Sequence, residues 1–178
     1  MKHKIHSSRL LICGVAAALS FIAVPAAAEQ DGPRLTVAFI SDAAEGSKIS
    51  KQQYDHAISE LEDDPKTGLR GFYAANNLCV SYLKVGDAEN AQVACDTAVE
   101  RIEGLIDQTP GSASRYPFGN EYARLLAVAL SNRGVINYIN NRPEQARDDF
   151  ESAIQANSAI REAQVNLDRL AELASKTA

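Results

Sequence analysis

A segment of 24 residues occurs twice in this chain, and this repetition limits the fold more than any other feature. The stretch "NNLCVSYLKVGDAENAQVACDTAV" (76–99) aligns without a gap with "SNRGVINYINNRPEQARDDFESAI" (131–154), 55 residues later. Asn77 meets Asn132 in this alignment, and Ala91 meets Ala146. Such self-similarity is typical of stacked structural units, so the repeat is interpreted before any single element is assigned.

Each unit reads as two helices joined by a tight turn. Gly86 and Asn141 tolerate the left-handed conformation that ends a helix, Asp87 suits a helix N-cap, and Pro143 suits a first helical turn. Apolar or small residues recur at helical spacing on both helices of the first unit, namely Ala75, Leu78, Cys79, Tyr82, Ala91, Cys95, Ala98 and Val99. The apolar face of such a hairpin is too wide to cover itself, so each hairpin must pack against another.

The hairpin between the two repeated segments is predicted to be lengthened. "VERIEGLIDQ" continues the apolar helical spacing, whereas "TPGSASRYPFG" (109–119) breaks it, and Asn120 suits the cap of a new helix starting near Glu121. A loop therefore lies at the hairpin tip. Its Tyr116 and Phe118 admit two readings, an exposed contact or two aromatics tucked onto the hairpin.

The repeated spacing resembles the tetratricopeptide repeat, a helical hairpin of 34 residues. The first copy carries Leu78-Cys79-x-x-Tyr82 followed by Ala91-x-x-x-Cys95 and Ala98, and the second carries Arg133-Gly134-x-x-Asn137 followed by Ala146-x-x-x-Phe150 and Ala153. Asn137 departs from the usual aromatic, for which Tyr138 is a substitute. The period extends to the flanks, because Ala57 lies 34 residues before Ala91 and Asn166 lies 34 after Asn132. The resemblance implies an all-helical solenoid over 48–178, with repeat units at 72–105 and 127–160 and half repeats at 48–65 and 158–175, the last a capping helix.

Family resemblance also implies a concave groove lined by the first helices and suited to an extended peptide or a partner helix. The expected groove residues are Tyr73, Asn76, Asn77, Val80, Val128, Ser131, Asn132, Val135, Glu162, Val165, Asn166 and Arg169. Asn77, Asn132 and Asn166 occupy one equivalent place in three first helices. A carboxamide both donates and accepts, so these asparagines either grip a bound backbone or, the favoured reading, bond the neighbouring helix.

The amino-terminal residues have the layout of a secretory signal. A basic head precedes a 15-residue apolar run, Leu10 to Val24, and small residues place cleavage between Ala28 and Glu29. The run is short for a membrane span, which needs about 20 apolar residues, so the mature form is expected to have no membrane segment. We expect residues 1–28 to direct export to a bacterial periplasm, with secretion as the alternative. Residues 29–47 form a poorly defined arm, in which "RLTVAFI" (34–40) reads as a strand, an extended arm or part of a worn helix.

Composition limits the chemistry of the mature chain. Loss of Lys2, Lys4 and Arg9 changes the formal charge from −5 to −8, and an acidic chain without a basic patch is a poor nucleic-acid ligand. Only His56, Cys79 and Cys95 remain of the residues that most often serve as metal ligands or nucleophiles. No catalytic or phosphate-binding motif is present, so no enzyme activity, cofactor or metal is expected.

Two questions stay open at the level of sequence. An oxidising compartment favours a disulfide between Cys79 and Cys95, while two buried thiols acting as small hydrophobes are equally compatible. The function expected is a periplasmic or secreted scaffold that binds a protein or peptide on its concave face. The alternative is a structural module that associates with a second copy of itself, and an enzyme ranks last.

Overall fold

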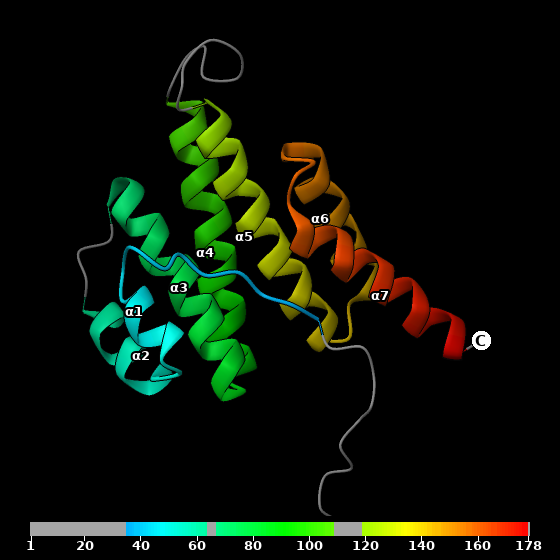
Figure 1. Ribbon diagram of the computed structural model, residues 1–178, viewed down its shortest axis with the longest axis horizontal. Coiled ribbons are helices and arrows are strands. Elements are labelled where there is room, and N and C mark those ends of the chain that lie inside the picture. The colour runs from blue at the N-terminus through cyan, green and yellow to red at the C-terminus, as the bar shows by residue number, and fades with distance from the viewer. Residues whose placement is uncertain (1–34, 64–66, 109–118, 178) are drawn as a thin grey trace, which may run out of the picture. The chain divides into compact units, whose positions relative to one another are not determined.

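The computed structural model describes residues 35–63, 67–108 and 119–177. All of them belong to one compact unit, Gly32–Ala178. The described residues form seven helices and no strand, which confirms the all-helical prediction for this part of the chain (Figure 1). The helices are α1 (Gly46–Ser50), α2 (Tyr54–Glu62), α3 (Gly68–Val85), α4 (Ala88–Asp107), α5 (Gly119–Ile139), α6 (Pro143–Ala156) and α7 (Arg161–Thr177). The predicted signal (1–28) and the tip residues Tyr116 and Phe118 lie outside the described residues.

Both predicted hairpins form, with the turn chemistry expected from the sequence. Gly86 ends α3 at φ 82°, and the side chain of Asp87 accepts a hydrogen bond from the N–H of Asn90 at the start of α4. Asn141 ends the first helix of the second hairpin at φ 58°, and Pro143 opens α6. Left-handed residues satisfy carbonyls at a helix end, and a proline at the first helical position loses no needed donor.

The lengthened middle hairpin is also present. α4 continues to Asp107 and packs on α5, which begins at Gly119 rather than near Glu121. Among the described helices, none is both long enough and apolar enough to span a bilayer.

The two ends of the helical region differ from the prediction. The predicted half repeat at 48–65 consists of two short helices, and the helical region begins at Gly46 instead of residue 48. The predicted terminal helix at 158–175 begins at Arg161, because the side chain of Asn157 accepts the N–H of Ala159 in a turn before it. Such local side-chain bonds compete with helix formation.

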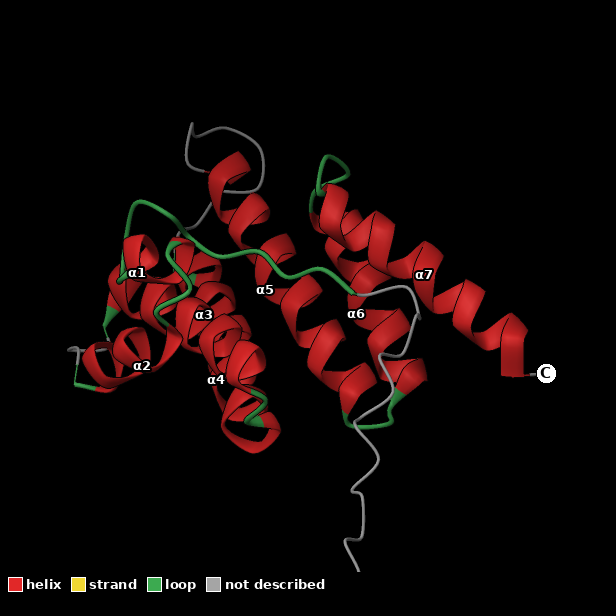
Figure 2. Cartoon of the chain, turned by 60° about the horizontal axis from the view of Figure 1, so that its bottom comes forward, coloured by secondary structure: helices red, strands yellow, loops and turns green. Residues whose placement is uncertain are grey.

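Residues 35–40 are extended, which selects the arm among the three readings of this segment. We call Leu35–Ile40 the arm. It crosses α3, α5 and α7, whose side chains it contacts (Figure 2). Its own backbone joins no sheet within the described part of the chain. The backbone groups of an extended segment need partners when they are buried, and here side chains of the helices supply them.

The two helices of each hairpin approach closely at one equivalent pair of positions, and the residues found there differ between the hairpins. In the second hairpin, a Cβ added to Gly134 would lie 2.5 Å from the ring of Phe150. In the first, the positions 55 residues earlier hold Cys79 and Cys95, which form a disulfide with their Cα atoms 4.9 Å apart. Glycine lets an aromatic ring cover the helix, whereas the disulfide links the two helices covalently.

Candidate functional site

Three asparagines on three different helices bind the main chain of the arm. Asn166 of α7 accepts the N–H of Thr36 at 2.7 Å and donates to its carbonyl oxygen at 2.7 Å. Asn132 of α5 pairs in the same way with Ala38, at 2.9 and 2.7 Å. Asn77 of α3 pairs with Ile40, at 2.8 and 2.9 Å. We call Asn77, Asn132 and Asn166 the asparagine ladder.

The asparagine ladder forms hydrogen bonds with every second residue of the arm because of the geometry of extended chains. Successive residues of a strand turn their N–H and C=O groups to opposite edges, so the residues numbered 36, 38 and 40 share one edge. A carboxamide carries a donor and an acceptor side by side and therefore mimics the paired groups of a neighbouring strand. All three ladder residues are fully buried, while Thr36 and Ala38, to which two of them bind, are half-buried and Ile40 is buried.

The side chains of the arm pack against three different apolar clusters of the core. Ala38 and Ile40 belong with the apolar cluster around Phe72 and Leu125, while Leu35 and Val37 pack against the cluster around Phe150. Phe39 joins Val37 against a third cluster that includes Leu78, Cys79 and Ile136. The alternate side chains therefore anchor the arm on both of its faces, and the main-chain bonds fix its register.

The predicted groove residues do not line a free groove, which corrects the prediction. The arm occupies the asparagine ladder, and the predicted groove residues that are buried are Asn76, Asn77, Val80, Val128, Ser131, Asn132, Val135 and Asn166. Tyr73 is half-buried against the core, and Val165 and Arg169 line a hollow together with Glu162, Thr36 and Val37. The physical reason is that an apolar, extended segment of the same chain satisfies both the apolar walls and the buried amides.

Structural and ligand-like roles are combined in these asparagines. The favoured sequence reading, a bond to the neighbouring helix, holds for Asn132, whose Nδ2 donates to the Oδ1 of Asn76 at 3.0 Å. Asn76 in turn donates to the carbonyl oxygen of Ala38 at 3.3 Å. The other reading, grip on a backbone, holds for the whole ladder, with the difference that the backbone belongs to the chain itself.

The turn after the arm depends on residues that sequence reasoning missed. Asn77 Nδ2 also donates to the carbonyl oxygens of Ala43 and Ala44, at 3.1 and 2.9 Å. A Cβ on Gly46 would lie 2.1 Å from the carbonyl oxygen of Ile40, so only glycine fits where the turn folds back. Thr36 adds a hydroxyl bond to Asn166 at 3.0 Å. The sequence of this segment is too short and too uniformly apolar to carry a periodic signal that would have found these residues.

The disulfide lies close to two residues of the asparagine ladder, Asn77 and Asn132. Cys79 follows Asn77 by two residues on α3, and the Sγ of Cys95 lies 4.0 Å from the carbonyl oxygen of Asn132. Both cysteines are fully buried. The covalent link between α3 and α4 therefore stabilises the part of the floor that holds Ala38 and Ile40.

In the second hairpin, an ion pair rather than a disulfide links the two helices, α5 and α6. The guanidinium of Arg133 binds Asp149 of α6 at 2.6 Å, and the amide of Asn137 donates to the same carboxylate at 2.8 Å. Burial by itself would lower the pKa of Arg133, but the hydrogen bond and charge of Asp149 raise it overall. Asn137, which stands where the resemblance predicts an aromatic residue, thus has a structural partner.

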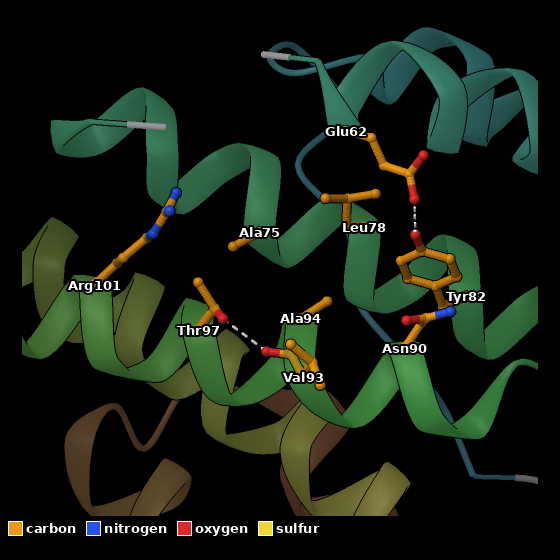
Figure 3. Close-up of a pocket in the computed structure, with 9 residues that line it drawn as sticks. All are labelled: Glu62, Ala75, Leu78, Tyr82, Asn90, Val93, Ala94, Thr97 and Arg101. Atoms are coloured by element: carbon orange, nitrogen blue, oxygen red, sulfur yellow. Dashed lines mark hydrogen bonds between the residues drawn. The ribbon is translucent and has the colours of Figure 1, made fainter. Parts of the chain in front are cut away.

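A second hollow lies away from the arm, between α2, α3 and α4 (Figure 3). Leu78, Val93 and Ala94 give it an apolar floor, and Tyr82 closes one end by donating to Glu62. Arg101 at the other end donates to the carbonyl oxygen of Gly71 at 2.7 Å. Within the described ranges, no group of three or more histidine, cysteine or acidic residues is placed to hold a metal ion.

Comparison with known proteins adds no further constraint. The chain matches no protein-family model, no curated protein and no solved structure. The interpretation of the site therefore depends on the geometry of the arm and the ladder.

Proposed function

We propose that this chain is an exported, tetratricopeptide-like module that binds another protein on the face formed by α3, α5, α7 and the arm, without chemistry of its own. The observation that carries the proposal is the asparagine ladder, which pairs the main chain of Thr36, Ala38 and Ile40. A line of amides that recognises backbone accepts many sequences, which suits a scaffold.

The occupied groove changes how such a partner is expected to bind. Because the arm fills the ladder, a partner contacts a composite surface made of the arm and the exposed parts of the first helices. The hollow beside Thr36 and Val37, lined by Glu162 and Val165, belongs to this surface. An acidic mature chain favours partners that are neutral or basic at this face.

Site-specific photo-crosslinking in the cells that produce the protein tests this proposal. A photoreactive phenylalanine is placed at Asp42 or Glu162 beside the arm, and at Val93 or Glu151 on the second helices as matched controls; Asp42, Val93 and Glu151 are exposed. One partner protein is expected at both arm-side positions and at neither control. Adducts confined to the control positions, or none at any position, would rule the proposal out.

The alternative, self-association, has one supporting observation. The arm is held by side chains of the helices rather than by a sheet, so the arm of a second copy would reproduce the same bonds. Light scattering on the mature chain distinguishes the alternatives, because exchange of arms gives a dimer whose mass is independent of any partner.

A further inference from the structure

The asparagine ladder binds the arm only when the helices that carry it are correctly spaced. Its residues contact every second residue of an extended segment, so the amides of consecutive ladder residues must lie about 6.6 Å apart, the rise of two strand residues. The paired hydrogen bonds are between 2.7 and 2.9 Å long. Because such bonds weaken when the N···O distance exceeds about 3.2 Å, a shift of about half an ångström between two helices is enough to weaken a pair.

The two spacings of the ladder are set by different helices. Between Asn77 of α3 and Asn132 of α5, α4 packs against both helices. Between Asn132 and Asn166 of α7, the corresponding helix is α6. The disulfide joins Cys79 of α3 to Cys95 of α4, and the Sγ of Cys95 lies 4.0 Å from the carbonyl oxygen of Asn132. It therefore connects the three helices that set the first spacing, and it includes neither α6 nor α7.

The repetition of the hairpin indicates why the first spacing depends on a covalent bond. In the second hairpin, a Cβ on Gly134 would meet the buried ring of Phe150 at 2.5 Å, so this ring fills the space between the helices. The equivalent residues of the first hairpin are Cys79 and Cys95, with Cα atoms 4.9 Å apart. As separate thiols they are small hydrophobes, and no ring takes the place of the bond. Loss of the bond therefore allows α3 and α4 to shift.

We infer that the disulfide between Cys79 and Cys95 is a redox-sensitive device that controls the docking of the arm. The oxidised form holds Asn77 in register with Ile40, and reduction releases this end of the arm. The inference rests on the proposed function, because the arm belongs to the proposed binding face, and it names a regulation of that face.

The reductant is a dithiol, which attacks one sulfur as a thiolate and forms a mixed disulfide. Its second thiol then resolves this intermediate. The Sγ–Sγ bond breaks, Cys79 and Cys95 become thiols, and the dithiol becomes a disulfide after supplying two electrons and two protons.

Release is expected to begin at Ile40 and to spare Thr36. Asn77 also donates to two carbonyl oxygens of the turn at residues 43–44, so this turn loosens together with Ile40. The bonds between Asn166 and Thr36 depend on the packing of α5, α6 and α7, in which the disulfide has no part. One end of the arm therefore reports on the disulfide, and the other end is an internal control.

The coupling is reciprocal. Both cysteines are fully buried, and Val37 and Phe39 of the arm pack against the apolar cluster that contains them. If reduction favours the released arm, release of the arm must favour reduction by the same factor. Asn166→Ala, which weakens the arm far from the disulfide, should therefore make the disulfide easier to reduce in a buffer of reduced and oxidised glutathione. Gln164→Ala on the same helix is the matched control and should leave the reduction equilibrium unchanged.

Amide exchange measured by NMR on the mature chain tests the inference, with the disulfide intact and after reduction by a small dithiol. Circular dichroism checks that the helices persist. Exchange at Ile40 is expected to accelerate about tenfold or more on reduction, while exchange at Thr36 changes by less than about twofold. Cys79→Ala/Cys95→Ala should show the reduced pattern with or without the dithiol. This double variant keeps the test valid if the reduced wild type folds poorly.

Four outcomes would overturn the inference. Equal acceleration at Ile40 and Thr36 would mean that the disulfide supports the whole fold, as would loss of the helical signal in both the reduced protein and the double variant. Unchanged exchange at Ile40 would mean that the arm ignores the disulfide. Equal reduction of Asn166→Ala and Gln164→Ala would contradict the reciprocal coupling.

The crosslinking experiment separates this device from the proposed function. Adducts at Asp42 and Glu162 that are the same in wild type and in Cys79→Ala/Cys95→Ala would leave the scaffold function intact and remove only its regulation. Selective exchange at Ile40 in a protein that forms no adducts would do the reverse.

Discussion

Asn132 and Ala38 form a reciprocal pair across 94 residues of sequence: the amide of Asn132 donates to the carbonyl oxygen of Ala38 at 2.7 Å and accepts its N–H at 2.9 Å. Asn77 on α3 and Asn166 on α7 repeat this pair. One asparagine on each of three helices thereby takes the place of a neighbouring strand. The arm docks on it without any sheet.

Removal of one rung is expected to destabilise the fold. Asn132→Ala leaves the N–H of Ala38 and the Oδ1 of Asn76 without their partners, and each unsatisfied buried group costs about 1–3 kcal/mol. We expect the free energy of unfolding in urea to fall by about 3 kcal/mol. Gln164→Ala, which deletes an exposed amide bonded to Asp168, is the control and should change it by less than about 0.5 kcal/mol. Equal effects would show that the ladder does not hold the arm.

Amide exchange along the arm should alternate. The N–H groups of Thr36, Ala38 and Ile40 are bonded to the ladder, whereas those of Val37 and Phe39 face outward. We expect slow exchange at the first three residues and fast exchange at the other two, measured by NMR on the mature chain. Uniformly fast exchange would mean that the arm leaves the face in solution.

Two glycine-to-alanine substitutions should have opposite signs. An added Cβ at Gly134 meets the buried ring of Phe150 at 2.5 Å, and we expect this overlap to lower the free energy of unfolding by about 1–3 kcal/mol. At Gly104 the nearest atom is the end of the Gln108 side chain at 3.9 Å, so alanine should stabilise the helix by about 0.5–1 kcal/mol. Thermal denaturation of both variants checks the pair. A stabilising Gly134→Ala would show that the ring moves aside.

Reduction of the disulfide should lower stability without changing the fold. Cys79 and Cys95 are 16 residues apart, and a closed loop of this size contributes about 3 kcal/mol through the unfolded state. Unfolding in urea with and without reductant measures the loss. The double variant Cys79→Ala/Cys95→Ala should match the reduced protein and be insensitive to reductant. A wild-type midpoint unchanged by full reduction would contradict this account.

Alkaline pH should destabilise the protein partly through Tyr82. Burial, followed by the hydrogen bond to Glu62, raises the pKa of Tyr82 to about 12, against about 10 in an unfolded chain. The neutral phenol is thus favoured in the folded state, so its stabilisation is complete below pH 10 and is lost as the pH rises towards 12. The free energy of unfolding of wild type should approach that of Tyr82→Phe across this range. Parallel pH curves for the two proteins would refute the assignment.

The sequence determined the helices and hairpins of this protein because their causes are local. Helical spacing of apolar residues, the cap at Asp87 and the proline at 143 act within a few residues, and the 55-residue repetition marked both hairpins as one unit. The boundaries near residues 46 and 161 were missed, since short turns and side-chain bonds such as that of Asn157 shift a helix end without changing the pattern.

Only the tertiary structure decided what occupies the asparagine ladder and whether the cysteines pair. Six residues of the arm have no periodicity that distinguishes strand from helix, and their partners lie between 37 and 130 residues away. Likewise, a disulfide requires Cα atoms within about 7 Å, a distance set by the crossing of two helices. Local patterns fix elements, whereas the pairing of a chain with its own distant segments depends on buried hydrogen bonds that exist only after those elements have packed.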